Sequence, residues 1–90
     1  MTGYLLSPDA ACAAVDDGAV VLHMGTRRYF SLNETGAAIW RMLEDDVARE
    51  DIPARLGSLF AVDAAIATTA LDRLLEELAA EHLITFTEDA

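Results

Sequence analysis

The chain has 90 residues, of which 53% are hydrophobic, and it carries a formal net charge of −10 from sixteen acidic residues against six arginines. This length and hydrophobic content suit one domain, spanning residues 1–90, with a single core that needs neither disulfides nor a metal. The charge argues against nucleic acid and acidic membrane surfaces as partners, because Lys and Arg supply most of the nonspecific affinity for both.

Targeting signals and reactive side chains are scarce. The apolar stretches fall far short of the roughly 20 residues that span a bilayer, and the first residues lack a basic segment and a long apolar segment, so we expect no signal peptide. Cys12 is the only cysteine, which excludes an internal disulfide and indicates a cytoplasmic localisation. Cys12 and the isolated His23 and His82 lie in no activation motif and at no ligand-like spacing, so we predict no catalytic residue, no cofactor and no metal site. Both histidines are expected at the surface or in turns.

The first third of the chain predicts an antiparallel meander of three strands. The β-favouring residues fall in the ranges 11–15, 19–24 and 27–32, with turn signals between them. Asp16-Asp17-Gly18 signals the first turn, and its glycine is able to take a positive φ. The third strand of such a meander has a partner on one side only, so its other side is an open edge unless another segment covers it.

The third strand passes into the first helix with almost no loop. Asn33 is a good N-cap and Glu34 places negative charge on the first turn, although Ser31 with Glu34 also fits a capping box that would start the helix two residues earlier. The period-two pattern places Phe30 and Leu32 on one face of the strand. An exposed edge strand beside a helix is a docking place for an extended peptide.

Three helices and a short C-terminal extended segment or strand are predicted over residues 34–44, 50–60, 64–81 and 83–86. Asp63 is a suitable N-cap for the third helix. The apolar side chains of that helix cover roughly half of its circumference, which is wider than one packed face requires. Either the helix packs between the sheet and the other helices, or its flank around Leu71 and Leu75 forms one wall of a groove. The predicted fold class is α+β, a three-stranded antiparallel sheet followed by three helices.

The centre of the chain carries a specific pattern, Tyr-Phe-Ser-Leu-Asn-Glu-Thr-Gly at residues 29–36, which continues to Trp40. Residues 18–22 precede it, and residues 62–63, 74–79 and 83–84 follow it. Together they resemble the PqqD-like family, the RiPP recognition elements of ribosomal peptide biosynthesis. The resemblance covers the chain from Ala11 to Ile84.

The resemblance implies a winged-helix-like domain that is not an enzyme. Members of the family bind the leader segment of a precursor peptide as an added strand against their third strand, in a groove whose other wall is the third helix, and present the precursor to tailoring enzymes. Carried over by position, the peptide-binding residues are Arg27, Arg28, Tyr29, Phe30, Ser31 and Leu32 on the strand and Ala67, Ala70, Leu71, Leu74, Leu75 and Leu78 on the helix. Arg27 departs from the family, which usually has glycine at this place, so the resemblance leaves the turn type open.

Within the family, the layout is most similar to the leader-binding proteins of lasso-peptide clusters. Those work beside a cysteine protease that removes the leader and an ATP-dependent cyclase that closes the macrolactam. The partner of a radical-SAM enzyme, as in quinone-cofactor synthesis, is the alternative within the family. Two alternatives belong to other classes: the net charge argues against a winged-helix transcription regulator, and the lack of a nucleophile, base and oxyanion set argues against a catalytic domain.

The predicted site residues divide into groove and core. The candidate apolar anchors for the leader are Tyr29, Phe30, Leu71 and Leu75. Core packing is nevertheless the preferred role for Phe30, Leu32 and Trp40. Arg27 and Arg28 either pair with acidic leader residues or stay solvated at the edge, where charge discourages aggregation.

Overall fold

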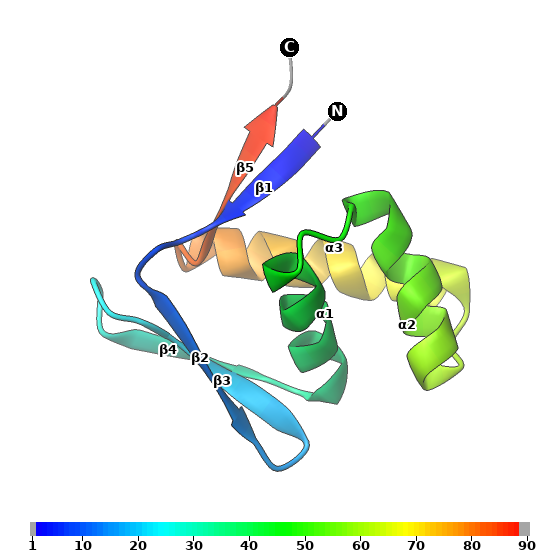
Figure 1. Ribbon diagram of the computed structural model, residues 1–90, viewed down its shortest axis with the longest axis horizontal. Coiled ribbons are helices and arrows are strands. Elements are labelled where there is room, and N and C mark those ends of the chain that lie inside the picture. The colour runs from blue at the N-terminus through cyan, green and yellow to red at the C-terminus, as the bar shows by residue number, and fades with distance from the viewer. Residues whose placement is uncertain (1, 89–90) are drawn as a thin grey trace.

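The computed structural model describes residues 2–88 and the side chains of residues 4–86. It confirms the predicted α+β class, with a three-stranded antiparallel sheet, three α-helices and a C-terminal strand (Figure 1). In chain order the elements are β1 (Thr2–Leu6), β2 (Ala10–Val15), β3 (Gly18–His23), β4 (Arg28–Leu32), α1 (Glu34–Glu44), the short 3-10 helix η1 (Arg49–Asp51), α2 (Ile52–Phe60), α3 (Ala64–Ala80) and β5 (Ile84–Glu88).

A second, two-stranded sheet joins the two ends of the described chain. β1 pairs with β5 in antiparallel register, with Tyr4 opposite Phe86. β5 confirms the strand option for the C-terminal segment, whereas β1 has no counterpart among the predicted strands. Its partner lies at the far end of the chain, so the local residue pattern does not reveal the pairing. The Tyr4 hydroxyl also donates a 2.6 Å hydrogen bond to the carbonyl of Val47, which ties β1 to the loop after α1.

The larger sheet and the helices enclose one hydrophobic core. The strand order is β2-β3-β4, and Ala19 stands opposite Leu32 while Val21 stands opposite Phe30. Ala19, Val21 and Leu32 are buried, and Phe30 packs against the core while remaining partly exposed. The helices complete the core with Ile39, Trp40, Met42, Leu43, Ile52, Leu56, Ala67, Leu71, Leu75 and Leu78. The core role predicted for Leu32 and Trp40 is confirmed.

The helices lie close to the predicted ranges: α1 and α3 start at the predicted residues, whereas α2 starts at Ile52 and is preceded by η1. Asn33 caps α1, because its side chain accepts a 2.8 Å hydrogen bond from the backbone N–H of Gly36. The earlier start at Ser31 is wrong, since Ser31 still pairs with Val20 in the sheet. Asp63 occupies the N-cap position of α3 but makes no capping hydrogen bond with its side chain. Within the described residues no single helix is long and apolar enough to cross a membrane; by length and composition alone, η1 and α2 together with α3, bent by 119°, pass that test as a pair.

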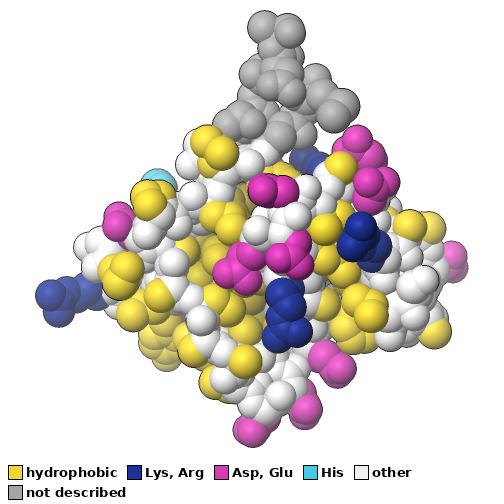
Figure 2. Space-filling model, in the orientation of Figure 1, with side chains coloured by type: hydrophobic (Ala, Val, Ile, Leu, Met, Phe, Trp, Pro, Cys, Tyr) yellow, Lys and Arg dark blue, Asp and Glu magenta, His cyan; other side chains and the backbone are white. Residues whose placement is uncertain are grey.

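Acidic side chains are spread over the molecular surface. Figure 2 shows them distributed across one face, with few basic side chains between them and hydrophobic side chains over both the strands and the helices. Among the described side chains, two ion pairs link separate elements: Arg28 Nε lies 3.0 Å from Glu81 Oε1, and Arg49 Nη2 lies 2.8 Å from Asp72 Oδ1. No group of three His, Cys, Asp or Glu side chains in the described part of the chain could hold a metal ion.

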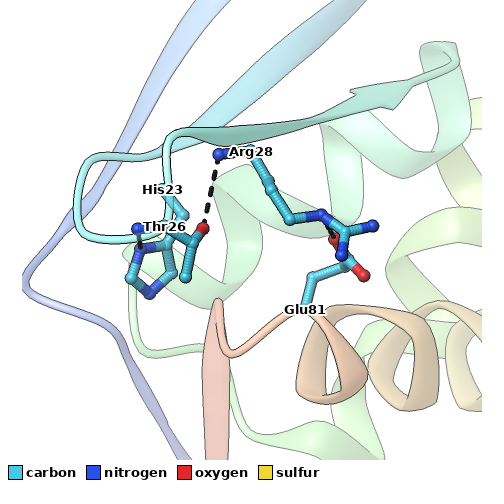
Figure 3. Close-up of polar contacts among 4 residues, drawn as sticks. All are labelled: His23, Thr26, Arg28 and Glu81. Carbon is cyan, nitrogen blue, oxygen red and sulfur yellow. Dashed lines mark hydrogen bonds and ion pairs between the residues drawn. The ribbon is translucent and has the colours of Figure 1, made fainter.

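The turn between β3 and β4 depends on His23 and Arg27. His23 is buried, with 8% of its surface exposed, and its Nδ1 accepts a 3.1 Å hydrogen bond from the N–H of Gly25. It also accepts a 3.2 Å hydrogen bond from the N–H of Thr26 (Figure 3). His23 is the last residue of β3 and is buried, so the predicted surface or turn position is wrong, although its side chain accepts hydrogen bonds from the turn that follows. Arg27 has a left-handed φ of 62° and donates a 2.7 Å hydrogen bond to the His23 carbonyl. Its inclusion in the strand is wrong, because β4 begins at Arg28.

Gly18 matters for its missing side chain. Gly18 does not take the positive φ that glycine permits, and Asp16 takes the positive φ of this turn. A Cβ atom on Gly18 would overlap with the carbonyl oxygen of Leu32, where β4 ends. Glycine therefore permits the close approach between the start of β3 and the junction of β4 with α1.

We expect Gly18→Ala to lower the free energy of unfolding by about 1–3 kcal/mol, because the added methyl group meets backbone atoms that cannot rotate away. Urea unfolding followed by circular dichroism measures this loss. An unchanged urea midpoint would show that the junction of β4 with α1 accommodates the added methyl group without loss of stability.

We expect Arg27→Gly to raise the free energy of unfolding by about 0.5 kcal/mol, because relief of the left-handed strain exceeds the extra chain entropy of glycine. Arg28→Gly is the matched control and should destabilise, since it weakens a strand and removes the ion pair to Glu81. Equal losses at both positions in the same urea assay would contradict the strain at Arg27.

Candidate peptide-binding groove

A groove of about 690 Å³ lies between β4, the first turns of α1, and α3, and we call it the β4–α3 groove. Its strand and α1 side consists of Phe30, Ser31, Leu32, Asn33, Thr35, Gly36 and Ile39. Its α3 side consists of Ala65, Ile66, Thr69, Ala70, Arg73, Leu74 and Glu77. Residues from the edge strand and from a distant helix thus share one concave surface.

The groove follows the open edge of β4. Phe30 and Leu32 face the core while Ser31 faces outward and is exposed, yet all three line the groove. A cavity that touches both faces of a strand must run along its edge. β3 pairs with the other side of β4, and no strand of the described chain pairs with this edge. Its backbone N–H and C=O groups are therefore available to an added strand.

The surface beside this edge is largely apolar. Leu32 and Ile39 are buried at its base, and Ala70 and Leu74 are half-buried on the α3 side. Ile66, on the α3 side of the groove, is 61% exposed. Apolar side chains of a bound ligand could displace water from this surface.

Of the α3 residues predicted to bind peptide, only some reach the groove. Ala70 and Leu74 line it, whereas Ala67, Leu71, Leu75 and Leu78 do not. These four are at most 2% exposed and belong to the core, since α3 turns this stripe toward the other helices and β5. The expectation that Leu71 and Leu75 form the groove wall is therefore wrong.

Some groove residues were not predicted from the sequence. Those on α3 form a stripe next to the buried stripe of Leu71 and Leu75. They are Ala65, Ile66, Thr69, Arg73 and Glu77, joined by Asn33, Thr35, Gly36 and Ile39 from the α1 side. Their signal is the spacing of Ile66, Ala70 and Leu74, four residues apart, which places three apolar side chains beside the core stripe.

The predicted strand residues divide in a similar way. Phe30, Ser31 and Leu32 line the groove, while Tyr29 is 70% exposed and does not. Arg27 lies in the turn outside β4. Arg28 bonds to Glu81 across the gap between the start of β4 and the end of α3 (Figure 3), and the pair marks this end of the groove.

Cys12, the one cysteine of the chain, does not have the properties of an activated nucleophile. Burial and the nearby Glu44 carboxylate raise the pKa of the Cys12 thiol, and the opposing effect of Arg41 does not cancel this rise. Cys12 thus stays a thiol at neutral pH, and a thiol is a poor nucleophile. It also does not line the groove.

We expect Leu71→Ala to lower the free energy of unfolding by about 2–5 kcal/mol, because it leaves a cavity in the core. Ile66→Ala, on the groove side of the same helix, should change it by no more than about 0.5 kcal/mol. Urea unfolding of both variants tests the assignment of the two stripes. Equal losses would contradict it.

Comparisons with known proteins agree with this geometry. The sequence matches the family described as coenzyme PQQ synthesis protein D (PqqD) over residues 18–84. The structure of TbiB1 in complex with the TbiA(beta) leader peptide is 31% identical, with a TM-score of 0.83 over 93% of this chain and 98% of that chain. A lasso peptide synthetase B1 complexed with the leader peptide is 27% identical, with a TM-score of 0.81 over 91% and 96% of the two chains. No curated protein sequence matches this chain.

The family match spans the elements that build the groove. It begins at Gly18, the first residue of β3, and ends at Ile84, the first residue of β5. It therefore includes β4, α1 and α3, whose side chains line the groove. The chain belongs to the PqqD family and is a PqqD-like RiPP recognition element.

Proposed function

We propose that this chain binds the leader segment of a ribosomally made precursor peptide as a strand added to β4 in the β4–α3 groove. The observation that carries the proposal is the open edge of β4, which runs along an apolar groove. The two structural relatives, each solved with a leader peptide, support the same use of the fold. The contact surface would be chiefly Phe30, Ser31, Leu32, Ile66, Ala70 and Leu74.

Backbone pairing and apolar anchors would act together. Hydrogen bonds along β4 give the register, but ordering a disordered leader costs about 2–5 kcal/mol. Fully burying one large aliphatic side chain recovers about 1.5–3 kcal/mol. Two groove-facing apolar side chains of the leader, set against Ile66 and Leu74, would therefore offset the ordering cost.

The domain would act without catalysis, in the cytoplasm, as a carrier for enzymes. The lasso-type relatives favour delivery of the precursor to a leader-cleaving cysteine protease and an ATP-dependent macrolactam cyclase. The PqqD match supports a second candidate, delivery to a radical-SAM enzyme. Pull-down of purified candidate enzymes by the chain, with and without leader, distinguishes the two partners.

Leader binding is tested by fluorescence anisotropy with the labelled leader of the precursor encoded beside this chain. We expect saturable binding to the native chain, and its absence would refute the proposal. We expect Ile66→Glu to weaken binding at least about tenfold, or about 1.4 kcal/mol, because it replaces an apolar anchor by a charge.

Leu59→Glu is the matched control for Ile66→Glu. Leu59 is 63% exposed and Ile66 61% exposed, both lie on helices, and Leu59 is absent from the groove. The two variants carry the same added charge, so the control should bind within about twofold of the native chain. If both variants lower the affinity for the leader equally, either the leader binds outside the groove or its affinity depends on the net charge of the chain.

A further inference from the structure

The α3 wall of the groove carries two charged side chains of opposite sign. Arg73 and Glu77 both line the groove and are exposed. The ion pairs formed among the described side chains are Arg28 with Glu81 and Arg49 with Asp72, so neither groove charge has an ionic partner there. Arg73 is also the only cation among the residues that line the groove in the described part of the chain.

The order of Arg73 and Glu77 along α3 does not favour an ion pair between them, so both can interact with a bound peptide. Arg73 precedes Glu77 by four residues, which places them on one side of the helix about 6 Å apart along its axis. An acid before a base is the favourable order for pairing within a helix, and here the order is reversed. The reversed order makes their pairing weaker, and Arg73 and Glu77 form no ion pair with each other among the described side chains.

An added strand presents side chains at nearly the same interval. Residues two apart on a strand point to one face and lie about 6.6–6.8 Å apart. Two successive groove-facing side chains of a guest can therefore stand opposite Arg73 and Glu77 together. Two complementary charges in the guest, separated by one residue, would match both.

The direction of the guest fixes which charge comes first. The ion pair of Arg28 with Glu81 places the start of β4 at the C-terminal end of α3, so β4 runs opposite to α3 along the groove (Figure 3). Every paired strand in the described sheets is antiparallel to its partner. A guest antiparallel to β4 runs in the direction of α3 and passes Arg73 before Glu77.

We propose that the leader recognised by this chain carries an acidic residue followed two residues later by a basic residue, read by Arg73 and Glu77. This inference rests on the proposed leader binding and names the chemistry of the guest. It also assigns the acid to Arg73 instead of Arg28, because Arg28 is already paired with Glu81. Arg73 and Glu77 are thus specificity determinants, while the apolar anchors supply most of the affinity.

The test uses synthetic leader peptides of one composition. In one series an acid–x–base triplet is moved one residue at a time along the leader of the precursor encoded beside this chain, and in the mirrored series the triplet is base–x–acid. At one register the acid-first peptide should bind about fivefold or more tightly than its mirror. The preference should shrink at about 1 M salt, where charges are screened within about 3 Å.

A charge-swapped chain provides the second arm. Arg73→Glu combined with Glu77→Arg keeps the net charge and should reverse the preference. Arg55→Glu combined with Glu76→Arg is the matched control, because both side chains are exposed and lie outside the groove, and it should keep the native preference. Equal affinity in the two series, or a preference for base-first peptides, overturns the charge order while leader binding stands. Failure of the unmodified leader to bind overturns both.

Discussion

The direct passage from β4 into α1 is the constraint on which the groove depends. Leu32 still pairs with Ala19, and the next residue, Asn33, already caps the helix through a 2.8 Å hydrogen bond from Gly36. The chain therefore leaves the sheet at once, with no residues left to fold back over the outer edge of β4. Gly18 makes the junction possible, because a side chain there would overlap with the Leu32 carbonyl. One cap and one glycine thus keep the edge open and set the first turn of α1 at the groove.

Secondary-structure elements and caps that depend on consecutive residues could be predicted from the sequence. Strand pairing between distant segments could not. The three strands of the larger sheet and the cap at Asn33 follow from local alternation and from the chemistry of one side chain. The pairing of β1 with β5 depends on residues at opposite ends of the chain. The conformation of Arg27 is intermediate: the family pattern marks the position as unusual, but only the backbone gives its left-handed φ of 62°.

The candidate site was predictable on its strand and misassigned on its helix for a physical reason. α3 has two adjacent apolar stripes, one with Leu71 and Leu75 and one with Ile66 and Leu74. Periodicity gives the angle between the stripes, but the packing of the other helices and β5 decides which is buried. The stripe with the most leucine enters the core, and the sparser stripe, interrupted by Arg73 and Glu77, remains at the groove.

The open edge of β4 also has a consequence for the protein without its guest. An unpaired strand edge can pair with the same edge of a second copy, which is the usual route to strand-mediated aggregation. Each copy carries a net charge of −10, and acidic side chains are spread over the face shown in Figure 2, so two approaching copies repel each other. This protection fades toward the sequence pI of about 4.2, where the net charge disappears. The acidic composition thus opposes pairing between the open β4 edges of two copies.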